Sequence, residues 1–154
     1  MEIVVNEWLL EYLRSDARQE DKALASEFVN DWLNARHKVV IKRNSPFTSK
    51  FYRYMGQSTR SIACRKRFSS LFQILFVDSD RTRILDDCDI TSLPPDLVDK
   101  VPSDDLYLIE LWHSVPGSVV VTTDEKLRQK LREHDSSAKI YLLQEFLRMD
   151  VAQK

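Results

Sequence analysis

The sequence predicts an α/β fold of three layers, α/β/α, around a central and mainly parallel sheet. Short runs of apolar residues alternate along the chain with longer segments whose apolar residues recur at helical spacing. Strands that read as continuous apolar runs are typical of a parallel sheet that helices cover on both faces. The 154 residues have the length of one ordinary domain, so we expect residues 1–154 to form a single domain.

The first half of the chain begins with a strand and then alternates helices and strands. Asn6 stands at the end of the first strand and can cap the helix that follows. Ser45 followed by Pro46 is a common start of a helix, an N-cap residue and then a proline in the first turn. The expected elements are a strand over 3–5 and a helix after it, a helix over 21–35, a strand over 38–42, a helix from Ser45 onward, and a mostly helical segment over 58–76.

The second half continues the alternation. The run SVVVT (118–122) is almost wholly apolar and predicts a buried strand, and Pro116 with Gly117 ends the helix before it. The expected elements are a strand over 82–85, a turn or loop over 91–95, a helix after Ser103 to about His113, the strand over 118–122, a helix from Asp124, a strand over 139–143 and a short C-terminal helix.

The composition argues against several classes of protein. With only two glycines the chain cannot build a glycine-rich phosphate loop or a dinucleotide fingerprint. Cys64 and Cys88 lack the spacing of a zinc site, and we interpret them as reduced thiols of a cytoplasmic protein, with a disulfide between them as the alternative. The N-terminus lacks the basic region of a signal peptide, and no apolar run approaches the roughly 20 residues that span a bilayer. We therefore expect no membrane association.

Charge is segregated along the chain. No acidic residue occurs between Asp31 and Asp78, whereas acids outnumber bases from Asp78 to Glu110. Aromatic residues are interleaved with the bases of the acid-free stretch, at Phe47, Phe51, Tyr52, Tyr54 and Phe68. The bases that we expect to contact a phosphate backbone are Arg43, Lys50, Arg53, Arg65, Lys66 and Arg67.

This stretch has two interpretations. A nucleic-acid backbone needs cations to replace its counterions, and unpaired bases stack on flat side chains, so the basic and aromatic residues predict a nucleic-acid surface. Alternatively, the bases form solvated helix faces and pair with the acidic segment in the fold.

Three polar residues are expected at one edge of the predicted sheet. Ligands of open parallel sheets bind beyond the carboxyl ends of the strands, where Asn6 and Asp124 follow strands and Asp105 opens a helix. Carboxylates brought together there repel each other unless they bind a cation such as Mg²⁺, which prefers oxygen ligands. Each residue also has a purely structural explanation, because Asn6 and Asp124 can cap helices and Asp105 suits the first turn of one.

The segment DDLYLIELWHSVPGSVVVTTDEKL (104–127) resembles the PIN-domain family of metal-dependent ribonucleases, which includes many toxins. It has an Asp opening a helix, an apolar helix face, and a strand that closes on Thr-x-Asp and a Leu. The opening IVVNEWLLEYL is similar to the first strand and helix of that family, and KIYLLQEFL is similar to its last strand and terminal helix. By this resemblance Asp105 and Asp124 are catalytic metal ligands and Thr122 supports them from the strand end.

The sequence also departs from the family pattern. Asn6 stands where the first metal-binding Asp is expected, and TSKFYRYM, around Lys50, has no acid where a Glu should follow the second strand. Asn6 still offers a neutral oxygen, and Asp104 or Glu125 can add a carboxylate if it turns inward.

The resemblance implies a PIN-like ribonuclease that uses Mg²⁺ (or Mn²⁺) to hydrolyse RNA, either as a toxin or in RNA processing. In that reading the metal is held by Asp105, Asp124, Asn6 and Asp104. The departures favour the alternative of a PIN-like module that binds RNA or a protein without cutting. The resemblance further implies an antitoxin-like partner or a homodimer.

Overall fold

Five parallel strands form the centre of the protein, in the order β3-β2-β1-β4-β5. The computed structural model describes residues 1–58 and 61–149. Its strands are β1 (Glu2–Val5), β2 (Lys38–Lys42), β3 (Thr82–Leu85), β4 (Val119–Thr122) and β5 (Ile140–Leu142). The central strands are buried almost throughout because helices cover both faces, which explains their runs of Val and Ile.

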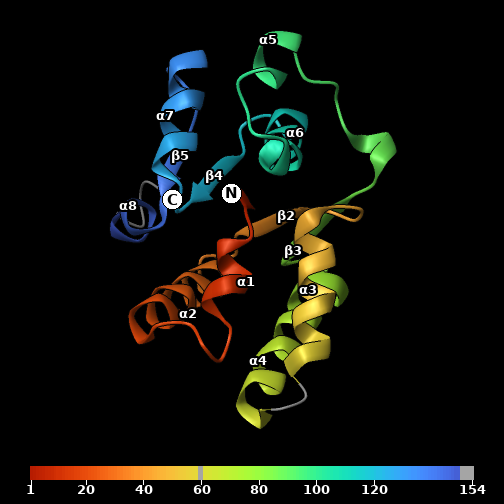
Figure 1. The fold of residues 1–154 in the computed structure, drawn as a ribbon, viewed down its shortest axis with the longest axis vertical. Helices are drawn as coiled ribbons and strands as arrows, with labels where there is room; N and C mark the ends of the chain where they lie inside the picture. Colours follow the sequence, from red (N-terminus) through yellow and green to blue (C-terminus); the bar gives the residue numbers. More distant parts are fainter. Residues whose placement is uncertain (59–60, 150–154) are drawn as a thin grey trace.

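Helices lie on both faces of the sheet, so the predicted α/β fold class is confirmed (Figure 1). One layer holds α1 (Trp8–Tyr12), α2 (Gln19–Asn34), α3 (Pro46–Gln57), α4 (Ile62–Phe72) and the π-helix η2 (Gln73–Val77). The other holds α5 (Pro95–Val98), α6 (Leu106–Ser114) and α7 (Glu125–His134). Two short 3-10 helices, η3 (Asp87–Asp89) and η4 (Ser103–Asp105), precede α5 and α6. The last helix, α8 (Leu143–Arg148), packs against α2.

Buried aromatic residues join α1 and α2 to the sheet. Trp8 packs edge-on against Phe28, with ring centroids 5.2 Å apart, and Phe28 in turn contacts Trp32. The indole Nε1 of Trp8 donates a hydrogen bond of 2.9 Å to the backbone oxygen of Val121 in β4. All three aromatic side chains are buried, so the segment that follows β1 is held firmly next to the end of β4.

The start of α1 corrects one expectation. Asn6 does not cap the helix: the N-cap position is Glu7, and no side chain caps it. Glu7 has helical backbone angles, whereas a capping side chain needs an extended backbone to reach back to the free N–H groups. The Asn6 side chain is instead directed into the protein, where its Oδ1 is buried.

Most expected elements are present with shifted ends. The second helix begins two residues earlier than expected, at Gln19, and the last strand ends at Leu142 because Leu143 already begins α8. The segment 58–76 follows the end of α3 and contains α4 and most of the π-helix, and residues 59 and 60 lie outside the described residues. The sequence analysis gave no indication of α5, a single turn within an otherwise extended stretch.

The state of the cysteines and the character of the helices also bear on the sequence analysis. Cys64 and Cys88 are both free thiols, the first buried and the second exposed, so the disulfide alternative is wrong. Within residues 1–58 and 61–149, no helix combines the length and the apolar character needed to cross a membrane.

We expect the replacement Ser45→Ala to lower the free energy of unfolding by about 1–2 kcal/mol. Ser45 Oγ accepts a hydrogen bond from the Thr48 backbone N–H at the start of α3 and donates one of 2.8 Å to the Lys42 oxygen. Urea unfolding measures the change. The matched control is Ser49→Ala on the exposed face of the same helix, which should change stability by only a few tenths of a kcal/mol. Equal effects of the two replacements would contradict the role of the cap.

Candidate functional site

The candidate site lies where the strand order reverses, between β1 and β4. The chain builds β2 and β3 on one side of β1 and then crosses to build β4 and β5 on the other side. Val5 pairs with Val121, so the residues that follow β1 and β4 emerge next to each other. Ligands of open α/β sheets bind in the crevice at such a switch point, beyond the carboxyl ends of the strands.

Asp124 is positioned by its own helix and by the end of β4. Its Oδ1 accepts a hydrogen bond of 3.0 Å from the Leu127 N–H, which makes it the N-cap of α7. The hydroxyl of the fully buried Thr122 accepts a 3.0 Å hydrogen bond from the Asp124 N–H. Asp124 itself is exposed, so capping fixes the carboxylate at the sheet edge and leaves it accessible. The helix-cap explanation of Asp124 is therefore confirmed, and it does not exclude a ligand role.

Asp105 lies close to Asp124 at the start of α6. It occupies the N-cap position of the helix, and its side chain makes no capping hydrogen bond. Partial burial raises the pKa of the Asp105 carboxyl, and the negative charge of Asp124 raises it further. The charges of Glu7 and Asp104 act in the same direction, and the charge of Lys130 opposes them. The two aspartates that the sequence predicted to meet are therefore close enough to repel each other.

Glu7 is a member of this site that the sequence analysis missed. It follows Asn6 directly, and its charge raises the pKa of Asp105 and of the buried Tyr107 hydroxyl, whose pKa burial raises most. The sequence held a signal for it, because Glu7 and Glu11 are four residues apart and share one face of α1. Position 6 holds the neutral Asn6, and its neighbour Glu7 supplies the negative charge.

The residues at the edge fit a weakly held hard cation. Among the described residues, no three His, Cys, Asp or Glu side chains are grouped so that they could hold a metal ion. The charges of two carboxylates, Asp105 and Asp124, nevertheless interact, and the buried Oδ1 of Asn6 has no hydrogen-bond partner within the described part of the chain. Mg²⁺ binds through one or two carboxylates and keeps several waters, so this set of donors suits it better than it suits a metal that needs a full protein cage.

Asp104 and Glu125, the two acids that could have compensated for the missing carboxylate, are exposed. Asp104 contributes to the electrostatics of Asp105, whereas Glu125 forms an ion pair of 3.2 Å with Arg128 one turn further along α7.

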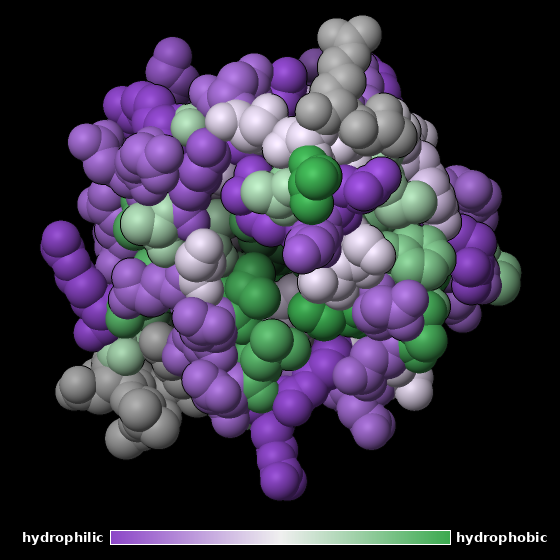
Figure 2. Space-filling model, turned by 90° about the horizontal axis from the view of Figure 1, so that it is seen from below, coloured by the Kyte–Doolittle hydropathy of each residue, from purple (hydrophilic) through white to green (hydrophobic). Residues whose placement is uncertain are grey.

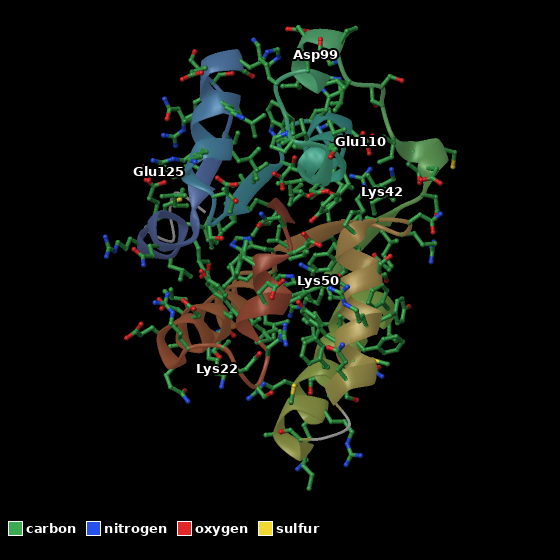
Figure 3. All side chains as sticks on the ribbon, viewed as in Figure 1. Lys22, Lys42, Lys50, Asp99, Glu110 and Glu125 are labelled. Atoms are coloured by element: carbon green, nitrogen blue, oxygen red, sulfur yellow. The ribbon has the colours of Figure 1, made fainter. Side chains whose placement is uncertain are left out.

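Lys50 of α3 faces the acidic edge. Its Nζ lies 2.7 Å from Glu11 Oε1 and 3.4 Å from Glu7 Oε1, and Figure 3 shows it between α3 and α1. Burial on its own would lower the pKa of Lys50, but the hydrogen bond to Glu11 and the charge of Glu7 outweigh it and raise the pKa. Burial likewise acts to raise the pKa of Glu11, and the hydrogen bond from Lys50 overcomes it. Lys50 is therefore a fixed cation of the site, in a segment where the PIN-like pattern requires an acid.

Other bases of the acid-free stretch also pair with acids. Lys42 Nζ lies 3.0 Å from Glu110 Oε2, on the far side of the sheet edge from Lys50 (Figure 3). Arg43 Nε lies 2.6 Å from Asp86 Oδ1 in an exposed ion pair. Lys42 and Arg43 therefore follow the alternative interpretation, in which bases of this stretch pair with acids in the fold.

Four of the expected phosphate-binding residues keep their charges outside ion pairs within the described part of the chain. They are Arg53, Arg65, Lys66 and Arg67. Arg53 lies over the Tyr54 ring, and Arg65 and Lys66 are exposed on α4. The aromatic residues divide more sharply, because Phe47, Phe51, Tyr54 and Phe68 are buried and Tyr52 is 50% exposed.

A groove between α2 and α4 is lined by Val29, Leu71 and Ile74, with Lys66 and Arg67 beside them. The face on which these helices lie is mainly hydrophilic, and hydrophobic residues gather around a hollow near its centre (Figure 2).

Comparison with known proteins adds no name to this geometry. No family model matches the chain, and no curated protein matches it.

We expect Asp105→Asn to stabilise the protein at pH 7 in the presence of EDTA. The pKa of Asp105 is raised in the folded state, so folded protein binds its proton more tightly than the unfolded chain does. The free energy of unfolding therefore falls as pH rises from the ordinary value of 3.8 through the raised one. Removing the charge cancels this loss, and the advantage of the variant should vanish below pH 3.8. Thermal unfolding across this pH range, with Asp104→Asn as the exposed control, measures the effect; a variant no more stable than wild type at pH 7 would count against the repulsion.

Proposed function

We propose that the protein is a PIN-like, Mg²⁺-dependent ribonuclease that cuts RNA at the carboxyl edge of β1 and β4. The observation that supports this proposal is the position of Asp105 and Asp124 at the switch point of the sheet, where burial raises the pKa of Asp105 and the charge of Asp124 raises it further. Charges that repel each other in a fixed position attract a cation.

The candidate ligands are Asp105, Asp124 and the neutral oxygen of Asn6. Asp124 is held by the Leu127 N–H and by Thr122, so its carboxylate does not need to be ordered when a ligand binds. When bound, Mg²⁺ supplies a positive charge to the scissile phosphate and lowers the pKa of an attacking water. The exposed bases Arg53, Arg65 and Lys66 attract the polyanion to the molecule.

The replacement Asp124→Asn should abolish Mg²⁺-dependent cleavage of a labelled RNA. Asn is as good an N-cap as Asp, so the hydrogen bond from Leu127 and the fold should persist while the charge is lost. Cleavage is followed on a denaturing gel with Mg²⁺, with Mn²⁺ and with EDTA. Glu125→Gln, which removes an exposed acid one residue away, serves as the control and should cleave like wild type. Wild-type levels of cleavage by Asp124→Asn would remove Asp124 from the mechanism.

A second function is favoured by Lys50. Its ammonium supplies one positive charge to Glu7 and Glu11 without a metal, so the edge is already partly neutralised. An ammonium cannot activate water as Mg²⁺ does. With this cation in place, the protein would bind RNA or a partner protein without cutting it.

The replacement Lys50→Gln separates the two functions. If the ammonium takes the place of a metal, the wild-type protein should bind no Mn²⁺, and the variant should bind it because Glu7 is freed beside Asp105. Isothermal titration calorimetry with Mn²⁺ measures this difference directly. Lys42→Gln is the control, since it breaks a similar ion pair with Glu110 away from the candidate ligands. Binding of Mn²⁺ by wild type with the same affinity as by Lys50→Gln would exclude the non-cleaving function.

A further inference from the structure

Tyr52 is an exposed aromatic ring on a rigid aromatic support. Its ring stacks on Phe76 of the π-helix η2, with centroids 5.6 Å apart and an angle of 28° between the planes. Phe76 rests in turn on Phe51 and Phe72, at 5.1 and 5.5 Å. The Tyr52 ring itself contacts Phe76 and Phe51, and half of the Tyr52 surface remains open to solvent. Its orientation is therefore fixed by packing before anything binds.

The π-helix contributes to this arrangement. Segments of this kind are rare, and they occur frequently at functional sites. Here Phe72 is the last residue of α4 and Phe76 lies in η2, and both rings reach the same aromatic cluster beside α3.

We propose that Tyr52 is a stacking platform for a base of single-stranded RNA. Base–aromatic stacking needs a flat and accessible ring whose ordering costs little on binding, and Tyr52 meets both conditions. This inference rests on the proposed handling of RNA and names the part of the substrate that is recognised, an unpaired base.

The charges around the ring fit a polyanion. Arg53 is the next residue and is exposed, and the guanidinium of Arg43 lies close enough to interact electrostatically with Tyr52. No acid occurs in α3, in α4 or in the π-helix. The nearest acidic partner of Arg43 is Asp86, whose charge the ion pair already balances.

The platform and the candidate site lie on opposite sides of α3. Lys50 contacts Glu7 at the acidic edge, and Tyr52 follows two residues later, about 3 Å further along the helix axis. A single strand whose phosphate lies at the sheet edge can place a neighbouring base against this ring. A duplex cannot, because its bases are paired and stacked inside.

The test measures RNA affinity in EDTA, where metal-dependent cleavage is absent. A fluorescein-labelled single-stranded RNA is titrated with wild type and with Tyr52→Ala, and anisotropy is recorded. Loss of one stacked base should weaken binding roughly 5- to 150-fold. Tyr52→Trp should restore wild-type affinity or exceed it. The dependence on salt should not change in Tyr52→Ala, whereas Arg53→Gln should reduce its logarithmic slope by about 0.7.

Matched variants separate the platform from the catalytic proposal. Ile62→Ser removes another exposed apolar side chain, on α4, and should bind RNA as wild type does. Cleavage by Asp124→Asn is measured separately with Mg²⁺ and tests only the catalytic proposal, so its loss leaves the platform untouched. Wild-type affinity of Tyr52→Ala, an equal loss for duplex RNA, or absence of RNA binding by the wild-type protein would each overturn it. Self-association that Tyr52→Ala abolishes would assign this face to a protein contact and would overturn it as well.

Discussion

The candidate site depends on one constraint, the side-by-side position of β1 and β4. Hydrogen bonding between these strands fixes Val5 opposite Val121, and the Trp8 indole adds a bond from the first turn after β1 to the Val121 oxygen. Two segments more than 110 residues apart therefore emerge at the same point of the sheet edge. Without that pairing Asn6 and Glu7 would have no fixed relation to Asp124, and their chemistry would be that of isolated surface residues.

Packing and electrostatics act in opposite directions at this edge. Burial of Trp8 and the cap of α7 hold carboxylates at this edge, and the pKa of Asp105 is raised there by burial first and then by the charges of Asp124 and Glu7. Lys50 of α3 balances part of this negative charge, because it forms ion pairs with Glu7 and Glu11. Such ion pairs add little stability where solvent reaches them, so we regard Lys50 chiefly as a determinant of which cations the edge admits.

The sequence predicted the features that depend on local physics. Apolar runs mark the strands because both faces of the sheet are covered, and Ser45 with Pro46 marks the start of α3 because capping involves residues three apart. The meeting of Asp105 with Asp124 followed from the geometry of parallel sheets. The part played by Glu7 and the pairing of Lys50 did not, because they depend on how α1 packs against α3. The sequence also does not show that Phe51 is buried and Tyr52 exposed, because tertiary packing decides which of two adjacent helical positions faces the core.

The choice between cutting and binding depends on how strongly the Lys50–Glu7 ion pair is coupled to the carboxylates of Asp105 and Asp124. Glu7 forms an ion pair with Lys50, and its charge also acts on Asp105. It therefore couples the ion pair to the carboxylate of Asp105. If the ammonium holds Glu7, the charge of that carboxylate is balanced and Glu7 is not available to a divalent ion. If a metal draws Glu7 away, Lys50 loses a partner and its charge becomes available to a phosphate. Both states keep a cation next to the acids, and under the proposed function only the metal-bound one would hydrolyse RNA.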